Sequence, residues 1–322
     1  MTTGRASRTR GLPVPVVEVA KGIFRIGPLD TFTRETPATT PYVVVGDKQA
    51  AIVEFGEVGQ APALLQAIRQ IGVSFDRIAY IMASHIHLHH IGGVNFLLKE
   101  IPHAKLVIHQ RGAPHVAEPT RLNASTLQVW GESSGCPQIS PVPMDSILPV
   151  SGGEVFDLGG RELEIIETLG HAPHHIAIFD RLSKVLFAGD AAGVLRMGSE
   201  RCSPDIRPPL FEMEAAAESL QRLRAFNPSA LFLFGYGGVS HSPDKTLQWS
   251  EDDIRAVEVI CREGMQQKLS NKVIGEKVRE YYRSVGITME ADGPQGGADR
   301  GMAPIGMVAY VKKNHPELEL PL

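Results

Sequence analysis

The stretch Ser84-His85-Ile86-His87-Leu88-His89-His90-Ile91-Gly92-Gly93 decides how this chain is interpreted. Four of the six positions from 85 to 90 are histidine, in a chain that has 12 histidines. An apolar run, Ile78–Met82, ends just before them and is typical of a buried strand. Imidazole is the commonest metal ligand in proteins. The stretch therefore predicts a metal site at the end of a strand, although an exposed histidine-rich turn has the same composition.

The spacing of these histidines predicts which of them bind the same metal ion. His85 and His87 are two residues apart in an extended segment, so their side chains point the same way and can hold one ion. His90 lies where the chain turns towards a helix, and can face a second ion. Two later strands end in the same manner, in Gly170-His171 and in Gly189-Asp190. Polar residues at strand ends assemble the sites of layered α/β folds, so we expect His171 and Asp190 to join the centre.

Outward from these motifs, short runs rich in β-branched residues predict strands, and helical spacing predicts helices between them. The expected strands are Tyr42–Val45, Ala50–Glu54, Arg77–Met82, Lys105–His109, Leu163–Glu167, Ile176–Phe179, Lys184–Ala188 and Ala230–Phe234. Helices are expected over Leu64–Ile71, Ala216–Phe226 and Glu251–Ser284. Because strands and helices alternate, the class is α/β or layered α+β.

The 322 residues allow one large α/β domain or two small ones, and no internal repeat divides them. We expect a flexible tail over 1–15, one domain over 16–250, and a C-terminal helical extension over 251–322 packed on that domain. The proline-containing region 113–151 is expected to be an irregular lid or binding loop. The glycine-rich segment 290–301 is expected to be a mobile loop.

The composition is that of a globular protein, with 43% hydrophobic and 21% charged residues. A net charge of −4 gives no electrostatic reason to expect nucleic acid or an anionic membrane as partner. Three scattered cysteines fit a reducing compartment. Without a run of about 18 apolar residues or a signal-peptide core, we expect a cytoplasmic protein that acts on small molecules. A homo-oligomer is left open.

These motifs together resemble those of the metallo-β-lactamase superfamily. His85–Gly93 resembles its HxHxDHxGG signature, and Gly170-His171 and Gly189-Asp190 follow in the family's order. Gly170–His175 is similar to the GHAPHH motif of a branch of uncharacterised metallo-hydrolases. The resemblance implies an αββα sandwich with the site at one edge. It further implies a first metal on His85, His87 and His171, and a second on His90 and Asp190, with Asp190 bridging.

Departures from the family pattern fall on the second metal. His89 stands where the family has an aspartate; an imidazole can still ligate or accept a proton, but it removes one negative charge. The histidine of the family's final motif is missing: Tyr236 stands nearest its place, and His241 could substitute if the loop folds back. The earlier Asp-x-Gly motif of many relatives is Glu54-Phe55-Gly56 here, which is a milder change. We therefore expect a mononuclear or unequal site, with one or two zinc ions, or iron or manganese in their place.

The expected function is metal-dependent hydrolysis of a small ester, lactone, thioester or similar electrophile by a metal-bound hydroxide. His89 or Asp190 would move the proton, and the Tyr236 hydroxyl would help to stabilise the oxyanion. The alternatives are a di-iron redox or oxygen-binding protein of the same fold and a catalytically degenerate binding scaffold. Further candidates are substrate contacts at His115 and Arg121 and hydrogen bonds to the ligands from His174 and His175.

Overall fold

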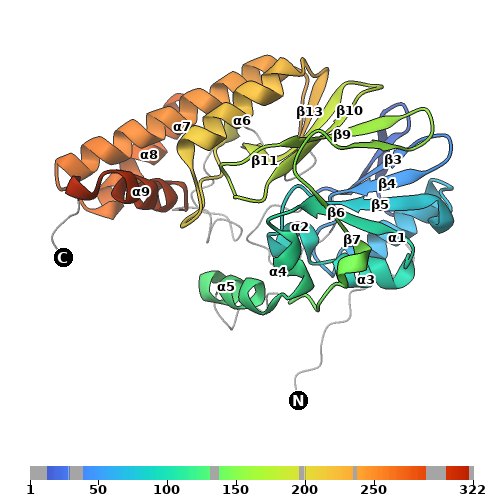
Figure 1. Cartoon of the computed structure of the whole chain (residues 1–322). Coiled ribbons are helices and arrows are strands. Elements are labelled where there is room, and N and C mark those ends of the chain that lie inside the picture. Colours follow the sequence, from blue (N-terminus) through green and yellow to red (C-terminus); the bar gives the residue numbers. More distant parts are fainter. Residues whose placement is uncertain are drawn as a thin grey trace.

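The computed structural model describes residues 13–27, 29, 39–130, 138–195, 199, 201–234, 238–287 and 302–318. Two sheets lie face to face, with helices on the outer side of each (Figure 1). This arrangement is the αββα sandwich expected from the motifs. Among the described residues, no helix is both long and apolar enough to cross a membrane.

The first sheet has seven strands in the same order in space as in sequence. They are β1 (Val16–Ala20), β2 (Ile23–Ile26), β3 (Tyr42–Val45), β4 (Ala50–Val53), β5 (Ile78–Met82), β6 (Lys105–His109) and β7 (Ile147–Val150). Strands β1 to β4 pair antiparallel, and β4 to β7 pair parallel. Parallel neighbours need crossover connections, which carry helices. These helices are α1 (Ala61–Gln70), α2 (Leu88–Ile91), α3 (Val94–Glu100), α4 (Ala113–Ala117) and α5 (Thr120–Trp130).

The second sheet has the order β14-β13-β11-β10-β9-β8, with β12 paired to β11. Its strands are β8 (Val155–Asp157), β9 (Glu162–Glu167), β10 (Ile176–Asp180), β11 (Val185–Leu195), β12 (Cys202–Ser203), β13 (Ala230–Phe234) and β14 (Val239–Ser240). Its outer face is covered by α6 (Met213–Ala225) and α7 (Pro243–Gln266), and α8 (Asn271–Ser284) and α9 (Met302–Asn314) pack on α7 (Figure 1).

Three separate apolar cores fill the three spaces between the four layers. One lies under α1 and α3 and includes Ile68. A second lies between the sheets, where Tyr42 stacks on Phe232 at 5.0 Å between ring centroids and meets Phe187 edge-on at 5.1 Å. The third lies between the second sheet and α6–α9 and includes Val257. Because hydrophobic burial is the main favourable term in folding, these cores fix the layer order and hence the edge where the strand ends meet.

All eight expected strands are present, but several expectations are wrong in detail. The region 113–151 contains α4 and α5 as well as β7, so it is not simply irregular. The helix expected over Glu251–Ser284 is two helices: α7 begins earlier, at Pro243, and a break at 267–270 separates it from α8. The Ser270 side chain accepts a hydrogen bond from the Val273 amide and caps the second helix. The boundary drawn after residue 250 falls inside α7.

Two expectations concern parts of the chain that the structure does not describe. Most of the tail expected over 1–15, and all of the loop expected over 290–301, lie outside the described residues. The division into tail, domain and extension therefore stays a prediction.

Candidate metal centre

Two histidines that follow β5 and one that follows β9 bring three imidazole nitrogens together. His85 Nε2 lies 2.7 Å from His87 Nδ1, and His171 Nε2 lies 3.2 Å from the same His87 atom. His85 is completely buried and His171 almost so, whereas His87 is half-buried. These are the three residues expected at a first metal. Their nitrogens converge on one point although His171 comes from the other sheet.

Asp190 enters the centre from within a strand rather than from a strand end. The strand expected over Lys184–Ala188 continues as β11 to Leu195, and its register with β13 shifts on both sides of Gly189. Gly189 has φ +53°, and a Cβ there would lie 2.5 Å from the Ser84 Cβ and 2.7 Å from His175 Nε2. Only glycine fits such a close approach, which presents the next residue, Asp190, to the histidines.

His175 fixes the backbone at Asp190. Its Nε2 accepts a hydrogen bond from the Asp190 amide at 3.1 Å, so its proton is on Nδ1, which donates to Thr168 Oγ1 at 2.7 Å. The role suggested for His175 from the sequence, holding a ligand in place, agrees with this contact.

The Asp190 carboxylate shows that the centre suits a cation. It is 2% exposed, and neither oxygen accepts a well-aligned hydrogen bond from a described residue; His90 Nε2 lies 3.4 Å from Oδ1. Oδ2 lies 3.5 Å from His171 Nε2 and 3.8 Å from His85 Nε2, while Oδ1 lies 3.4 Å from His90 Nε2. A buried carboxylate without well-aligned hydrogen bonds is costly unless a cation compensates it. Its two oxygens face different histidines, so a carboxylate bridging two ions fits this position.

The pKa values divide the imidazoles into two kinds. Burial, and then the neighbouring imidazoles, hold the pKa of His85 and of His87 well below the usual range, so both rings are neutral and keep a lone pair for a metal. Burial also disfavours charge on His90, but Glu54 and Asp190 outweigh it and raise its pKa to about 10. Burial would raise the pKa of Asp190, but His90 above all holds it well below the usual range.

Glu54 supports the second half of the centre. It follows β4 with φ 56°, an unusual backbone conformation for a residue other than glycine. Its Oε2 lies 2.7 Å from His90 Nδ1, and its Oε1 accepts a hydrogen bond from the Ser84 amide at 3.1 Å. A carboxylate on the outer nitrogen of a histidine orients the ring and strengthens the nitrogen that faces the metal.

His89, at the position of the family's aspartate, lies within this group. One nitrogen or oxygen of each of His85, His87, His89 and Asp190 lies within 4.8 Å of the others. The ring is half-buried, and burial together with the charge of His90 holds its pKa well below the usual range. A neutral His89 can therefore ligate or accept a proton, as the sequence suggested.

The sequence motifs missed two charged residues of the centre, Asp205 and Arg207. His171 Nδ1 donates to the Asp205 carbonyl at 2.9 Å, which leaves its Nε2 lone pair to face the centre. Side-chain atoms of His171, Asp190 and Asp205 also fall within 4.8 Å of one another. Arg207 Nε lies 2.8 Å from Asp205 Oδ1. Their segment follows the two-residue strand β12 and carries no recognisable motif, so no signal in the sequence pointed to it.

The remaining candidates are placed less centrally. The His174 ring is 8% exposed and lies 6.1 Å from His87 and 6.3 Å from His85, between centroids. Burial lowers its pKa to about 3. His115, Arg121 and His241 are exposed. Tyr236, expected to stabilise an oxyanion, lies outside the described residues.

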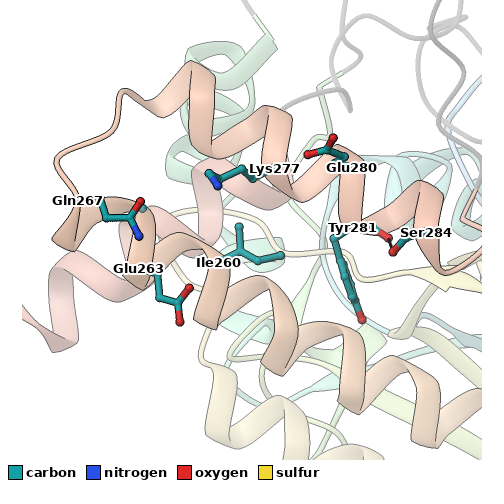
Figure 2. A pocket seen from close by; sticks show the side chains of 8 residues that line it. Ile260, Glu263, Gln267, Lys277, Glu280, Tyr281 and Ser284 are labelled. Carbon is teal, nitrogen blue, oxygen red and sulfur yellow. Dashed lines mark hydrogen bonds between the residues drawn. The ribbon is translucent and has the colours of Figure 1, made fainter.

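A hollow of about 350 Å³ between α7 and α8 is separate from this centre (Figure 2). Glu263, Lys277 and Glu280 line it, and Tyr281 reaches across from α8 to donate a hydrogen bond to Asp253 on α7. Its lining contains none of the histidines described above.

Comparison with known proteins agrees with this geometry. Residues 36–236, more than half of the chain, match the family model for the metallo-β-lactamase superfamily. The metallo-β-lactamase fold-containing protein ST1585 of Sulfurisphaera tokodaii is 28% identical over 207 residues, which cover 62% of this chain and 73% of that protein. The crystal structure of ST1585 superimposes with a TM-score of 0.65 over 89% of this chain and 97% of that one, at 22% identity.

Two further comparisons bear on chemistry. Hydroxyacylglutathione hydrolase GloC of Haemophilus influenzae is 29% identical over 148 residues, 45% of this chain and 61% of that protein. A structure described as a peroxy diiron species of the chemotaxis sensor ODP shares the fold, with a TM-score of 0.55 and 16% identity over 74% of this chain and 94% of that one. With the family match spanning the strands that carry the centre, the chain belongs to the metallo-β-lactamase superfamily.

Proposed function

We propose that this protein is a metal-dependent hydrolase that acts on a small ester, lactone, thioester or similar electrophile. The observation that carries the proposal is the buried Asp190 carboxylate, which accepts no well-aligned hydrogen bond from the described residues and is surrounded by imidazole nitrogens at 3.4–3.8 Å. Membership of the superfamily and the similarity to a hydroxyacylglutathione hydrolase support hydrolysis, and within it a thioester.

The donor set fits one or two dications. His85, His87 and His171 would hold one, and His90, Asp190 and His89 would hold the other. Bound there, a dication supplies Lewis-acid activation of water and of the substrate carbonyl. Zinc, iron and manganese all accept imidazole and carboxylate together, so the donors alone do not select among them.

The protein's own groups orient and accept protons. The Asp205 carbonyl fixes His171 with its proton on Nδ1, and Glu54 does the same for His90. His89 is neutral and half-buried, and its ring centroid lies 5.7 Å from that of His87. When His89 does not hold an ion, we assign it the acceptance of a proton from the attacking water and its return to the leaving group.

A di-iron redox or oxygen-binding role is the second candidate. The observation in its favour is His89, which makes the centre richer in imidazole and poorer in carboxylate than the family signature implies. The shared fold with a di-iron sensor adds no information about this chain's metal.

Metal content and turnover test the proposal together. Protein grown with zinc, iron or manganese would be analysed by plasma mass spectrometry and assayed on esters, lactones and thioesters, beside His85→Ala/His87→Ala and the exposed control His103→Ala. We expect about one or two ions per chain and turnover, both lost only in the double variant. Less than about a tenth of an ion per chain would rule out the hydrolase, and iron with an optical band but no turnover would favour the redox role.

A further inference from the structure

Arg207 is a fixed positive charge built into the wall of the candidate metal centre. Its side chain is 12% exposed, and its Nε contacts both carboxylate oxygens of Asp205, at 2.8 and 3.0 Å. The backbone carbonyl of the same Asp205 accepts the hydrogen bond from His171 Nδ1 at 2.9 Å. One residue therefore connects the guanidinium to a predicted metal ligand.

Arg207 lies close to the ligand cluster, because its partner Asp205 has Oδ2 at 3.8 Å from His171 Nδ1, and side-chain atoms of His171, Asp190 and Asp205 lie within 4.8 Å of one another. After burial and the neighbouring imidazoles, the charge of Arg207 contributes to the lowered pKa of His87 and of His89. These two rings are the half-buried ones, whereas His85 and His90 are completely buried. These contacts place the guanidinium next to the ligand cluster, and the half-buried His87 and His89 form the more accessible part of that cluster.

A guanidinium next to a dication is unfavourable unless negative charge offsets it. The nearby carboxylates are Glu54, Asp190 and Asp205, whose three negative charges balance Arg207 and one dication. A second dication would leave two positive charges in excess. His89, which stands in place of an aspartate, carries no negative charge that could compensate it. An anionic substrate would supply it.

We propose that Arg207 binds a carboxylate of the substrate, so that the protein prefers esters or thioesters whose acyl part carries a negative charge. Arginine suits this role because its planar, permanently charged fork matches a carboxylate. Asp205 holds the fork by Nε and fixes its direction. The inference rests on the proposed hydrolase function and names its substrate class.

Paired substrates that differ in charge test it. The metal-loaded protein would be assayed on p-nitrophenyl acetate and on mono-p-nitrophenyl succinate, as wild type and as Arg207→Met, Arg207→Lys and the exposed control Arg283→Met. We expect Arg207→Met to raise KM for the succinate ester about 10- to 100-fold and to leave that for the acetate within about twofold. Arg207→Lys, which keeps the charge without the fork, should fall between. If Arg207→Met loses its metal, Arg207→Lys is the variant whose KM values test the inference.

Calorimetric titration with succinate separates this inference from the proposed function. If both esters are hydrolysed and Arg207→Met and Arg207→Lys alter neither KM, the inference is overturned and the hydrolase stands. If neither ester is hydrolysed, succinate binding that is weakened about tenfold or more in Arg207→Met still supports the carboxylate site. Absent or equal succinate binding in both proteins overturns it, as does tighter binding of inorganic phosphate than of succinate.

Discussion

Replacement of His174 by glutamine should flatten the pH dependence of stability in the metal-free protein. In the folded chain, burial lowers the pKa of His174 to about 3, so the ring stays neutral in mild acid. In the unfolded chain it gains a proton as the pH falls below its ordinary pKa of about 6.5. The stability that this neutral ring contributes is therefore complete above that value and is lost as the pH falls towards 3.

The size of the effect follows from the two pKa values. Between about pH 7.5 and about pH 5, preferential protonation of the unfolded state costs the wild type about 2 kcal/mol through His174 alone. Glutamine keeps polarity without titrating in this range. His174→Gln should thus lose about 2 kcal/mol less than wild type over the same interval, whatever its stability at neutral pH.

Urea unfolding of chelator-treated protein, at several pH values, measures this difference. The exposed His103→Gln is the matched control and should follow the wild-type curve. Parallel pH curves for wild type and His174→Gln would refute the reasoning, because they would mean that His174 takes up its proton equally in both states.

Three further substitutions have definite expected outcomes. Glu54→Gln should weaken binding of one metal ion about 10- to 100-fold in chelator competition, because it removes the carboxylate that supports a ligand. Gly306→Val should lower both the melting temperature and the metal content, because a Cβ at this position of α9 would lie 2.3 Å from the Ile206 carbonyl oxygen. Unchanged metal content would contradict this prediction. Arg161→Met should lower the free energy of unfolding in urea by about 3–5 kcal/mol, because it removes the two hydrogen bonds, at 2.8 and 3.0 Å, that Arg161 donates to the buried Asp180 carboxylate. A loss below about 1 kcal/mol would contradict this prediction.

The fold and much of the candidate site could be predicted because both depend on local patterns. Buried strands such as β10, in which all five residues are buried, read directly as apolar runs. Strand β1 could not be recognised in this way because it is half exposed and carries charge, and β7 contains Pro149. Helix α5 was missed because it lies in a stretch where neighbouring prolines suggested a loop.

The site residues were recognised to the extent that they belong to one continuous motif. His85, His87 and His90 lie within six positions, whereas Asp205 orients His171 through its backbone carbonyl, a contact that no side-chain pattern reveals. Asp190 lies among the histidines, as the motif suggested, but the backbone brings it there in a different way from the one expected. The strand does not end before it; a register shift at Gly189 turns it inwards.

The C-terminal helices, which lie beyond the family match over 36–236, contribute to the centre through packing. Gly306 on α9 brings that helix against the backbone of Ile206, the residue between Asp205 and Arg207. Phe211 meets Tyr310 of α9 edge-on at 6.1 Å, further along the same segment. The segment that orients His171 and carries Arg207 is therefore fixed from outside by α9. Because close-packed interiors transmit displacement, loosening α9 should move the positive wall of the centre while leaving His85 and His87, which depend on the first sheet, in place.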